Sequence, residues 1–283
     1  MTAIQKIRPS PIAGSWYSGD EKKLRAQVNG FMERAHPAQV PGELIGLVSP
    51  HAGYAYSGPT AGYSYACVQG KSYDLVVIAS PLHEYLPYPF ITSAHAIYGT
   101  PLGNVPVDVD LLERLQTMVQ EQAGINIVAV ANDPEHSLEI QLPFLQCALA
   151  NPFSLLPIMV RSEDPTSLQQ FGTILAELIR GKKVLLVAST DLSHFFTLDQ
   201  AEILDKHMLA QIQALSPEGV LQAERENTGF ACGSGAVAVI LWAAKALGAD
   251  TVTLLHHSTS AESTHDESQV VGYGAAAISR TSN

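Results

Sequence analysis

Cysteine is scarce in this sequence, with three residues among 283, at positions 67, 147 and 232. An odd number of widely spaced cysteines does not make a disulfide framework, so we expect free thiols in a reducing compartment. Residues 1–15 also lack the apolar stretch that follows the basic residues of a secretory signal. These absences predict a cytoplasmic protein without disulfides.

Charged residues are few, and basic residues are the rarer kind. Charged residues make up 15% of the chain and hydrophobic residues 46%, so the chain has enough apolar surface to bury a substantial core. The 16 basic and 27 acidic residues give a formal net charge of −11, which would repel the phosphates of a nucleic acid. We therefore expect no nucleic-acid partner.

Long hydrophobic runs are also absent. The longest run, residues 235–244, stops at Lys245. It reaches about half the ~20 residues that a helix needs to cross a bilayer. This run predicts a buried core helix, and no membrane partner is expected.

What the sequence does contain is a series of short apolar runs that alternate with helical patterns. Most of these runs lack an alternation of apolar and polar residues, which is typical of strands covered on both faces. The pattern predicts an α/β fold with a mainly parallel central sheet and helices on both faces. The expected strands are residues 44–49, 74–80, 125–130, 155–160, 183–189 and 251–257.

Capping residues indicate where several helices begin. Asp20 precedes apolar residues at helical spacing, and Asp133 followed by Pro134 predicts a helix that continues to Leu149. No linker, repeat or charge run divides the chain, so we expect a single domain over residues 1–283. Further helices are expected at residues 111–122, 165–180, 198–215 and 233–247.

Three of the expected strands are followed closely by a histidine: His51, His83 and His194. Ligands of open α/β sheets bind at the carboxyl ends of the strands, so these histidines are expected to converge in one cleft. The alternative is that each is a loop or capping residue bonded to backbone. The repetition at three strand ends favours a site.

Cys232 lies in a turn of small residues that leads into an apolar helix. The positive end of a helix dipole favours a thiolate, which makes Cys232 the candidate reactive cysteine, although a small core residue is an equal alternative. Cys67 and Cys147 are expected to pack in the core. Two imidazoles and a thiolate suit zinc, copper or iron better than magnesium or calcium.

Familiar short catalytic motifs are missing: the sequence has no His-Glu-x-x-His, no Cys-x-x-Cys and no Gly-x-Ser-x-Gly. Asp191 and His194 are three residues apart, which on a helical turn would let the carboxylate orient the imidazole for proton transfer. Asp191 could equally cap that turn. The polar segment 256–267 could offer further metal ligands, but its composition favours a solvated loop.

Eight short motifs occur in a characteristic order along nearly the whole chain. They are residues 13–17 (Ala-Gly-Ser-Trp-Tyr), 50–58 (Pro-His-Ala-Gly-Tyr-Ala-Tyr-Ser-Gly), His83, 100–103 (Thr-Pro-Leu-Gly), 135–139 (Glu-His-Ser-Leu-Glu), 191–194 (Asp-Leu-Ser-His), 232–233 (Cys-Gly) and 271–273 (Val-Gly-Tyr). This set resembles the Memo family, whose bacterial and archaeal members are called AmmeMemoRadiSam system protein B.

The resemblance implies an architecture like that of the LigB-type class III extradiol dioxygenases, which bind iron through two histidines and a glutamate. By position, His51 and His83 look like the histidine ligands, Cys232 stands in the place of the glutamate, and His194 looks like the acid/base histidine with Asp191 beside it. The thiol departs from the usual two-histidine, one-carboxylate set of non-haem iron.

We expect Trp16, Tyr54 and His136 to contact the substrate. The first functional hypothesis is a metal-dependent oxidoreductase that uses iron or copper on an unknown small molecule. The second is a non-catalytic adaptor that binds a peptide or small ligand in a dioxygenase-like pocket. The third is a zinc hydrolase. The family resemblance also suggests AMMECR1-domain and radical SAM proteins as partners.

Overall fold

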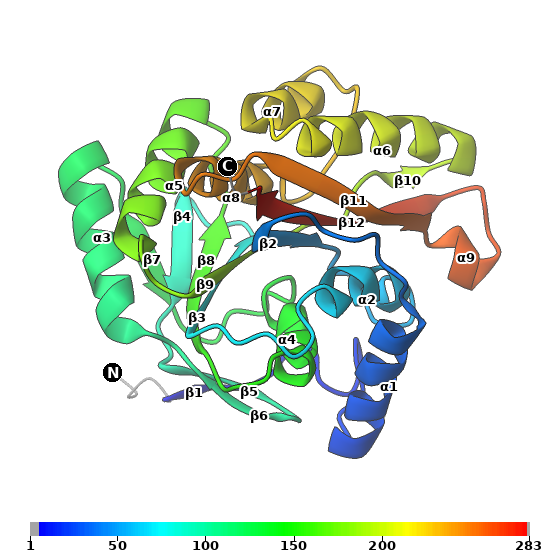
Figure 1. Ribbon diagram of the computed structural model, residues 1–283, viewed down its shortest axis with the longest axis horizontal. Helices are drawn as coiled ribbons and strands as arrows, with labels where there is room; N and C mark the ends of the chain where they lie inside the picture. The colour runs from blue at the N-terminus through cyan, green and yellow to red at the C-terminus, as the bar shows by residue number, and fades with distance from the viewer. Residues whose placement is uncertain (1–5, 282–283) are drawn as a thin grey trace.

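The computed structural model describes residues 6–281 and shows an α/β fold in which helices flank a mixed β-sheet (Figure 1). The expected domain spans residues 1–283, and its first five and last two residues lie outside the described part of the chain. Within residues 6–281, nine strands form the main sheet and three form a smaller one.

The centre of the main sheet is parallel, as its apolar sequence predicts. Four neighbouring strands run in the same direction, and almost all of their residues are buried. In spatial order they are β2 (Glu43–Ser49), β9 (Val184–Ser189), β3 (Leu75–Pro81) and β8 (Ser154–Val160).

Antiparallel pairs at both sides make the whole sheet mixed. On one side β12 (Val270–Arg280) is antiparallel to β2 and also pairs with β10 (His194–Phe196) and β11 (Thr251–Thr259). On the other side β4 (Phe90–Ser93) is antiparallel to β8 and parallel to β7 (Ile127–Val130). The smaller sheet contains β1 (Ile7–Arg8), β5 (Ile97–Thr100) and β6 (Gly103–Pro106).

Helices cover both faces of the main sheet (Figure 1). One face is covered by α1 (Glu21–Arg34), α2 (Gly58–Ala66) and α4 (Leu142–Ala148). The other carries α3 (Val109–Ala123), α5 (Pro165–Ile179), α6 (Leu198–Gln213), α7 (Pro217–Arg225) and α8 (Ser234–Ala246). A short helix, α9 (Ala261–Thr264), follows β11.

Several predicted helix starts are confirmed. Asp20 caps α1 by accepting a hydrogen bond from the backbone N–H of Lys23, and the apolar residues of that helix are buried. The apolar run 235–244 lies in α8, whose residues from Ala236 to Ala244 are all buried. Between residues 6 and 281, no helix is long and apolar enough to cross a membrane.

The helix predicted from Asp133 to Leu149 is wrong over its first half. The carboxylate of Asp133 binds the guanidinium of Arg8, 125 residues away, and Glu135 is the residue that accepts hydrogen bonds from the next two backbone N–H groups. Helical structure begins only with a 3-10 turn, η1 (Glu139–Gln141), which continues into α4. The segment before it is a loop that turns toward the ends of the central strands.

Candidate metal centre

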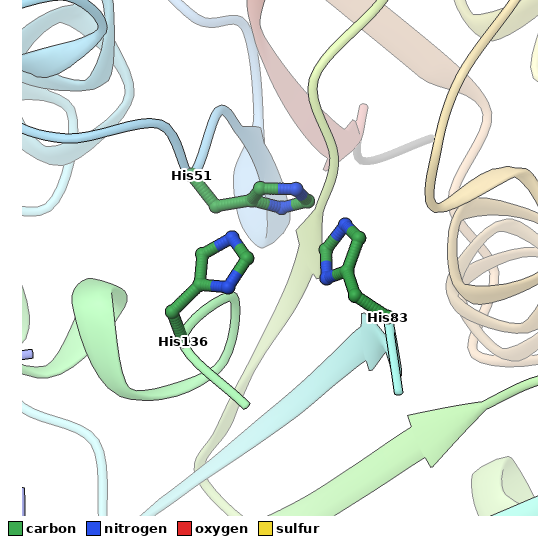
Figure 2. A group of neighbouring side chains, drawn as sticks. All are labelled: His51, His83 and His136. Carbon is green, nitrogen blue, oxygen red and sulfur yellow. The ribbon is translucent and has the colours of Figure 1, made fainter. Parts of the chain in front are cut away.

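The carboxyl ends of the parallel strands bring two histidines together. His51 follows β2 and His83 follows β3, and β9 lies between these two strands. The centroids of the two imidazole rings are 5.4 Å apart (Figure 2). The expected convergence of His51 and His83 at one edge of the sheet is therefore confirmed.

A third imidazole, from His136, completes a cluster. It stacks on His83 with a centroid distance of 4.6 Å, and its centroid lies 5.5 Å from that of His51. Ligand atoms of His51, His83 and His136 all lie within 4.8 Å of one another, so the three residues could hold a metal ion. The sequence predicted His194 as the third histidine at this edge and His136 as a substrate contact.

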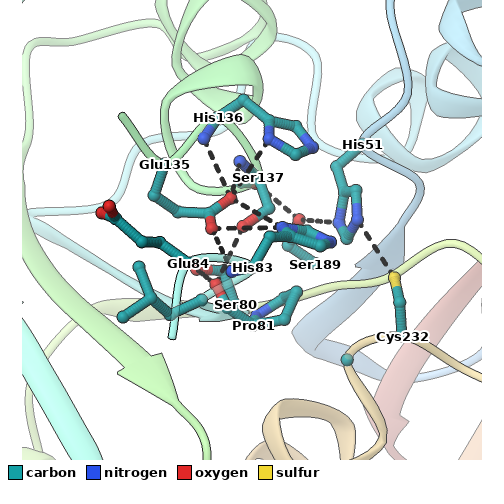
Figure 3. A network of polar contacts seen from close by, with 12 residues as sticks. His51, Ser80, Pro81, His83, Glu84, Glu135, His136, Ser137, Ser189 and Cys232 are labelled. Carbon is teal, nitrogen blue, oxygen red and sulfur yellow. Dashed lines mark hydrogen bonds and ion pairs between the residues drawn. The ribbon is translucent and has the colours of Figure 1, made fainter. Parts of the chain in front are cut away.

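The thiol of Cys232 lies next to this cluster (Figure 3). Its Sγ is 3.1 Å from Nε2 of His51 and accepts a hydrogen bond from the backbone N–H of Asp191 at 3.3 Å. Nitrogen and sulfur ligands of one tetrahedral ion are separated by about 3.5 Å. The 3.1 Å contact between His51 and Cys232 is shorter than this and has the length of a hydrogen bond, and Cys232 is not among the residues whose ligand atoms all lie within 4.8 Å of one another.

The predicted activation of Cys232 by a helix dipole is wrong. Helix α8 begins at Ser234 with Gly233 as its N-cap, so Cys232 precedes the helix. Burial raises the pKa of the Cys232 thiol above its usual value, and the nearby carboxyl of Asp191 raises it further. Without a metal ion the thiol is therefore expected to stay protonated at neutral pH.

Ser189 fixes the protonation of the His51 ring. Its hydroxyl donates to the carbonyl of Ser137 at 2.6 Å, so toward the nitrogen of His51, 3.0 Å away, the oxygen acts only as an acceptor. Nδ1 of His51 therefore carries a proton, and Nε2 is the unprotonated nitrogen, which faces the thiol of Cys232. Burial, followed by the neighbouring His136 and His83, holds the pKa of His51 well below its usual value and keeps the ring neutral.

Glu135 fixes the protonation of the His83 ring in a similar way. Its carboxylate accepts from the backbone N–H of His83 at 2.6 Å and from Nδ1 of the ring at 3.0 Å, which leaves Nε2 available (Figure 3). Burial acts to lower the pKa of His83, but the hydrogen bond and charge of Glu135 outweigh it and the net shift is upward. From the sequence, Glu135 belonged to the motif 135–139 and to the expected helix, and no role in the site was predicted for it.

A buried ion-pair network supports the loop that carries Glu135 and His136. Arg8 is 1% exposed and donates to the carboxylates of Asp133 and Glu139 and to the backbone carbonyl of Glu135. Because these contacts lie on both sides of His136 along the chain, they hold the loop at both ends. No sequence signal indicated this role for Arg8.

The predicted Asp191–His194 pair is not formed. Residues 190–193 are not helical, and His194 begins β10 with its Nδ1 2.8 Å from the carbonyl of Leu192. Asp191 instead accepts hydrogen bonds from the backbone N–H groups of His51 and Ala52. Burial raises the pKa of Asp191 to about 7. Asp191 therefore positions the loop of His51, and it does not orient His194.

The three predicted substrate contacts separate into two groups. Trp16 is 37% exposed, and its ring centroid is 4.0 Å from that of His136, so these two residues meet beside the cluster. Tyr54 is buried, and its hydroxyl donates to the carbonyl of Ile140, which makes it a core residue. Packing of a tyrosine with a bonded hydroxyl was the alternative for this residue type.

Two of the three histidines of the segment 256–267, His256 and His257, have other partners. His256 stacks on Tyr63 with a centroid distance of 4.1 Å, and Nε2 of His257 is 2.8 Å from the carboxylate of Asp205. Both histidines lie in β11, which extends to Thr259. Neither is part of the histidine cluster.

The family model described as "Memo-like protein" matches residues 8–277. This chain belongs to the Memo family. The match includes all residues of the histidine cluster, Cys232 and the ion-pair network of Arg8.

Curated relatives of this Memo-family protein are similar over almost their whole length. A MEMO1 family protein of Nitrosopumilus maritimus is 34% identical over 95% of this chain and 98% of its own. One from Methanopyrus kandleri is 32% identical over 96% and 99%, respectively. Among solved structures, an uncharacterised protein of Escherichia coli K12, JW3007, matches 83% of this chain and 99% of its own with a TM-score of 0.52. At 12% identity that likeness concerns the fold alone.

Proposed function

We propose that this Memo-family protein is a metal-dependent oxidoreductase in which His51, His83 and Cys232 hold an iron or copper ion. The observation that carries the proposal is the orientation and protonation of the imidazole rings of His51 and His83. Each has its Nδ1 held by a neighbouring side chain, so the unprotonated Nε2 is the nitrogen that could bind a metal; in His51 that nitrogen contacts the thiol of Cys232. The thiol beside His51 adds a third donor.

The donor set fits a transition metal. Imidazole nitrogen and thiolate sulfur suit iron, copper and zinc, whereas magnesium and calcium prefer oxygen. A bound iron or copper ion would supply one-electron redox chemistry and oxygen activation. The backbone N–H of Asp191 already donates to Sγ of Cys232, and such a hydrogen bond favours the thiolate that metal binding requires.

His194 is the residue that we propose for proton transfer. The carbonyl of Leu192 can only accept a hydrogen bond, so Nδ1 of His194 carries the proton and Nε2 is free. Burial lowers the pKa of His194, which keeps the ring neutral at pH 7. A neutral ring with a free Nε2 can accept a proton from a substrate hydroxyl.

A zinc hydrolase is the second candidate, and the three-histidine cluster favours it. Three histidines with an open fourth position form one of the known catalytic zinc sites, in which the metal activates a water molecule. In that case His136 would replace Cys232 as the third ligand. The two candidates differ in metal and in ligand set.

Oxygen consumption tests the first proposal. The purified protein is stripped of metal, loaded with iron(II), copper or zinc in separate samples, and mixed with catechol or a hydroquinone. We expect oxygen uptake with iron or copper and none with zinc. His194→Ala should reduce that uptake by about 10²-fold or more without loss of metal. His207→Ala, which changes an exposed histidine of α6, is the matched control. Ester hydrolysis by the zinc form alone would support the second candidate instead.

A further inference from the structure

A cleft with a volume of about 420 Å³ adjoins the candidate metal centre. Ala52 and Gly53, which line it, directly follow His51 in the chain. Trp16, another lining residue, packs against the ring of His136. A molecule in this cleft would therefore lie beside the histidine cluster.

Aromatic residues dominate the walls of the cleft. Four rings line it, from Trp16, Tyr56, Phe195 and Tyr273. Three of them are unusually exposed for their size: Trp16 at 37%, Tyr56 at 47% and Phe195 at 69%. Exposed large apolar side chains that gather at one hollow of a surface are typical of a binding site.

Phe195 is held in this position against its backbone preference. Its φ angle is +64°, in the left-handed region that bulky residues rarely adopt, and the pairing of β10 with β12 is irregular around it. Such a conformation costs on the order of 1–3 kcal/mol. Burial of the side chain does not offset this cost, since the ring stays exposed. A strained residue that presents an exposed ring to a cleft indicates a role in ligand contact.

The charge of the cleft limits what it can bind. Among the described residues, none of those that line it is acidic, basic or a histidine. An anionic ligand would find no partner there and would be repelled by the formal net charge of −11. The polar groups that are present, such as Ser260, Thr264 and Gln269, can hydrogen-bond a neutral ligand.

We propose that the cleft between Trp16, Tyr56 and Phe195 recognises an uncharged small molecule with a flat aromatic portion. The assignment of this molecule as a substrate rests on the proposed function, because it places the aromatic portion beside the metal centre. Recognition itself depends only on the cleft. A phosphorylated or otherwise anionic ligand is disfavoured at this site.

Two fluorescent probes with the same ring system test this proposal. N-phenyl-1-naphthylamine is neutral, and 1-anilinonaphthalene-8-sulfonate adds one negative charge to the same skeleton. Fluorescence titration of the purified protein is expected to give a Kd for the neutral probe at least about tenfold lower than that for the sulfonate. Equal or tighter binding of the sulfonate would overturn the proposal.

Variants of the cleft locate the binding. Trp16→Ala and Phe195→Ala should each raise the Kd of the neutral probe about tenfold or more, because a stacking ring is lost. Tyr88→Ala, which removes another exposed ring outside this cleft, is the matched control and should leave the Kd unchanged.

Phe195→Gly separates ligand binding from a structural role. Glycine adopts positive φ without strain, so the melting temperature should be unchanged or higher while the probe binds about tenfold or more weakly. A variant that keeps wild-type affinity, or loses affinity only together with stability, would show that Phe195 has no role in recognition.

The same titration in metal-free protein separates this inference from the proposed function. The preference for the neutral probe should persist after treatment with a chelator. If the protein binds no metal but keeps the preference, only the proposed function fails. If it binds metal but shows no preference, only the inference about the cleft fails.

Discussion

Glu135 accepts hydrogen bonds from both the backbone N–H and the ring Nδ1 of His83, at 2.6 and 3.0 Å. The same carboxylate also accepts from the backbone N–H groups of His136 and Ser137. These donors outweigh burial and hold the pKa of Glu135 well below its usual range. One buried charge thus fixes the orientation of His83 and the start of the loop that carries His136. Carboxylates that contact a metal-binding histidine in this way orient the ring and raise its basicity.

Replacing this carboxylate should weaken metal binding. Glu135→Gln removes the charge and points an amide toward N–H donors, so His83 loses its fixed orientation. We expect the metal Kd to rise about 10- to 100-fold. Competition with a chromophoric chelator measures it, and Glu84→Gln, a change at an exposed neighbouring glutamate, is the control. An unchanged Kd in a folded Glu135→Gln protein would show that Glu135 does not act through His83.

Metal binding should also depend on pH through His83. Burial acts to lower the pKa of this ring, but Glu135 outweighs it, with a smaller contribution from Asp191, and the net shift is upward. A raised pKa means that the proton is retained to a higher pH and must be displaced by the metal. As the pH is lowered, the affinity for metal should therefore begin to fall while the pH is still above the ordinary histidine pKa of about 6.5. In Glu135→Gln the fall should begin at a lower pH. The same onset in both proteins would argue against this coupling.

Two substitutions decide between the possible third ligands. If Cys232 is a ligand, Cys232→Ala should raise the metal Kd at least about 100-fold, whereas His136→Ala should change it about tenfold or less. If His136 is the third ligand instead, His136→Ala should raise the metal Kd more than Cys232→Ala does. The stack of His136 with Trp16 makes a smaller effect of His136→Ala the expected result. Titration of the two variants with iron(II) and copper gives both values.

Removing the buried guanidinium of Arg8 should destabilise the protein. Arg8→Met leaves the carboxylates of Asp133 and Glu139 buried without their cation, which costs about 3–5 kcal/mol of the free energy of unfolding. Urea denaturation measures this loss. Arg25→Met breaks an exposed pair with Glu21 and should cost less than about 1 kcal/mol. Comparable losses in both variants would mean that the buried network contributes little.

The centre of the sheet could be predicted because its strands are apolar along their whole length. Strands β2, β3, β8 and β9 are recognisable from local sequence alone, and two of them place His51 and His83. The long strand β12 was missed, since its sequence is rich in glycine and alanine. Its strand conformation depends on pairing with β2 and β11, which local sequence does not reveal.

The errors in the site have a similar origin. Asp133 followed by Pro134 has the pattern of a helix start, but the partner of that carboxylate is Arg8, far away in the sequence. The spacing of Asp191 and His194 places two side chains on one side of a helix, but residues 190–193 are not helical. Burial and the carboxyl of Asp191 raise the pKa of Cys232, and neither can be recognised from its position just before a helix.

Metal content tests the central claim most directly. Wild-type protein and the double variant His51→Ala/His83→Ala are incubated with iron(II) or copper, and unbound metal is removed by gel filtration. The metal content of each protein is then measured by inductively coupled plasma mass spectrometry. Circular dichroism confirms that both proteins are folded. We expect close to one equivalent of metal per wild-type chain and almost none in the double variant. Equal metal in both folded proteins, or none in the wild type, would contradict the central claim.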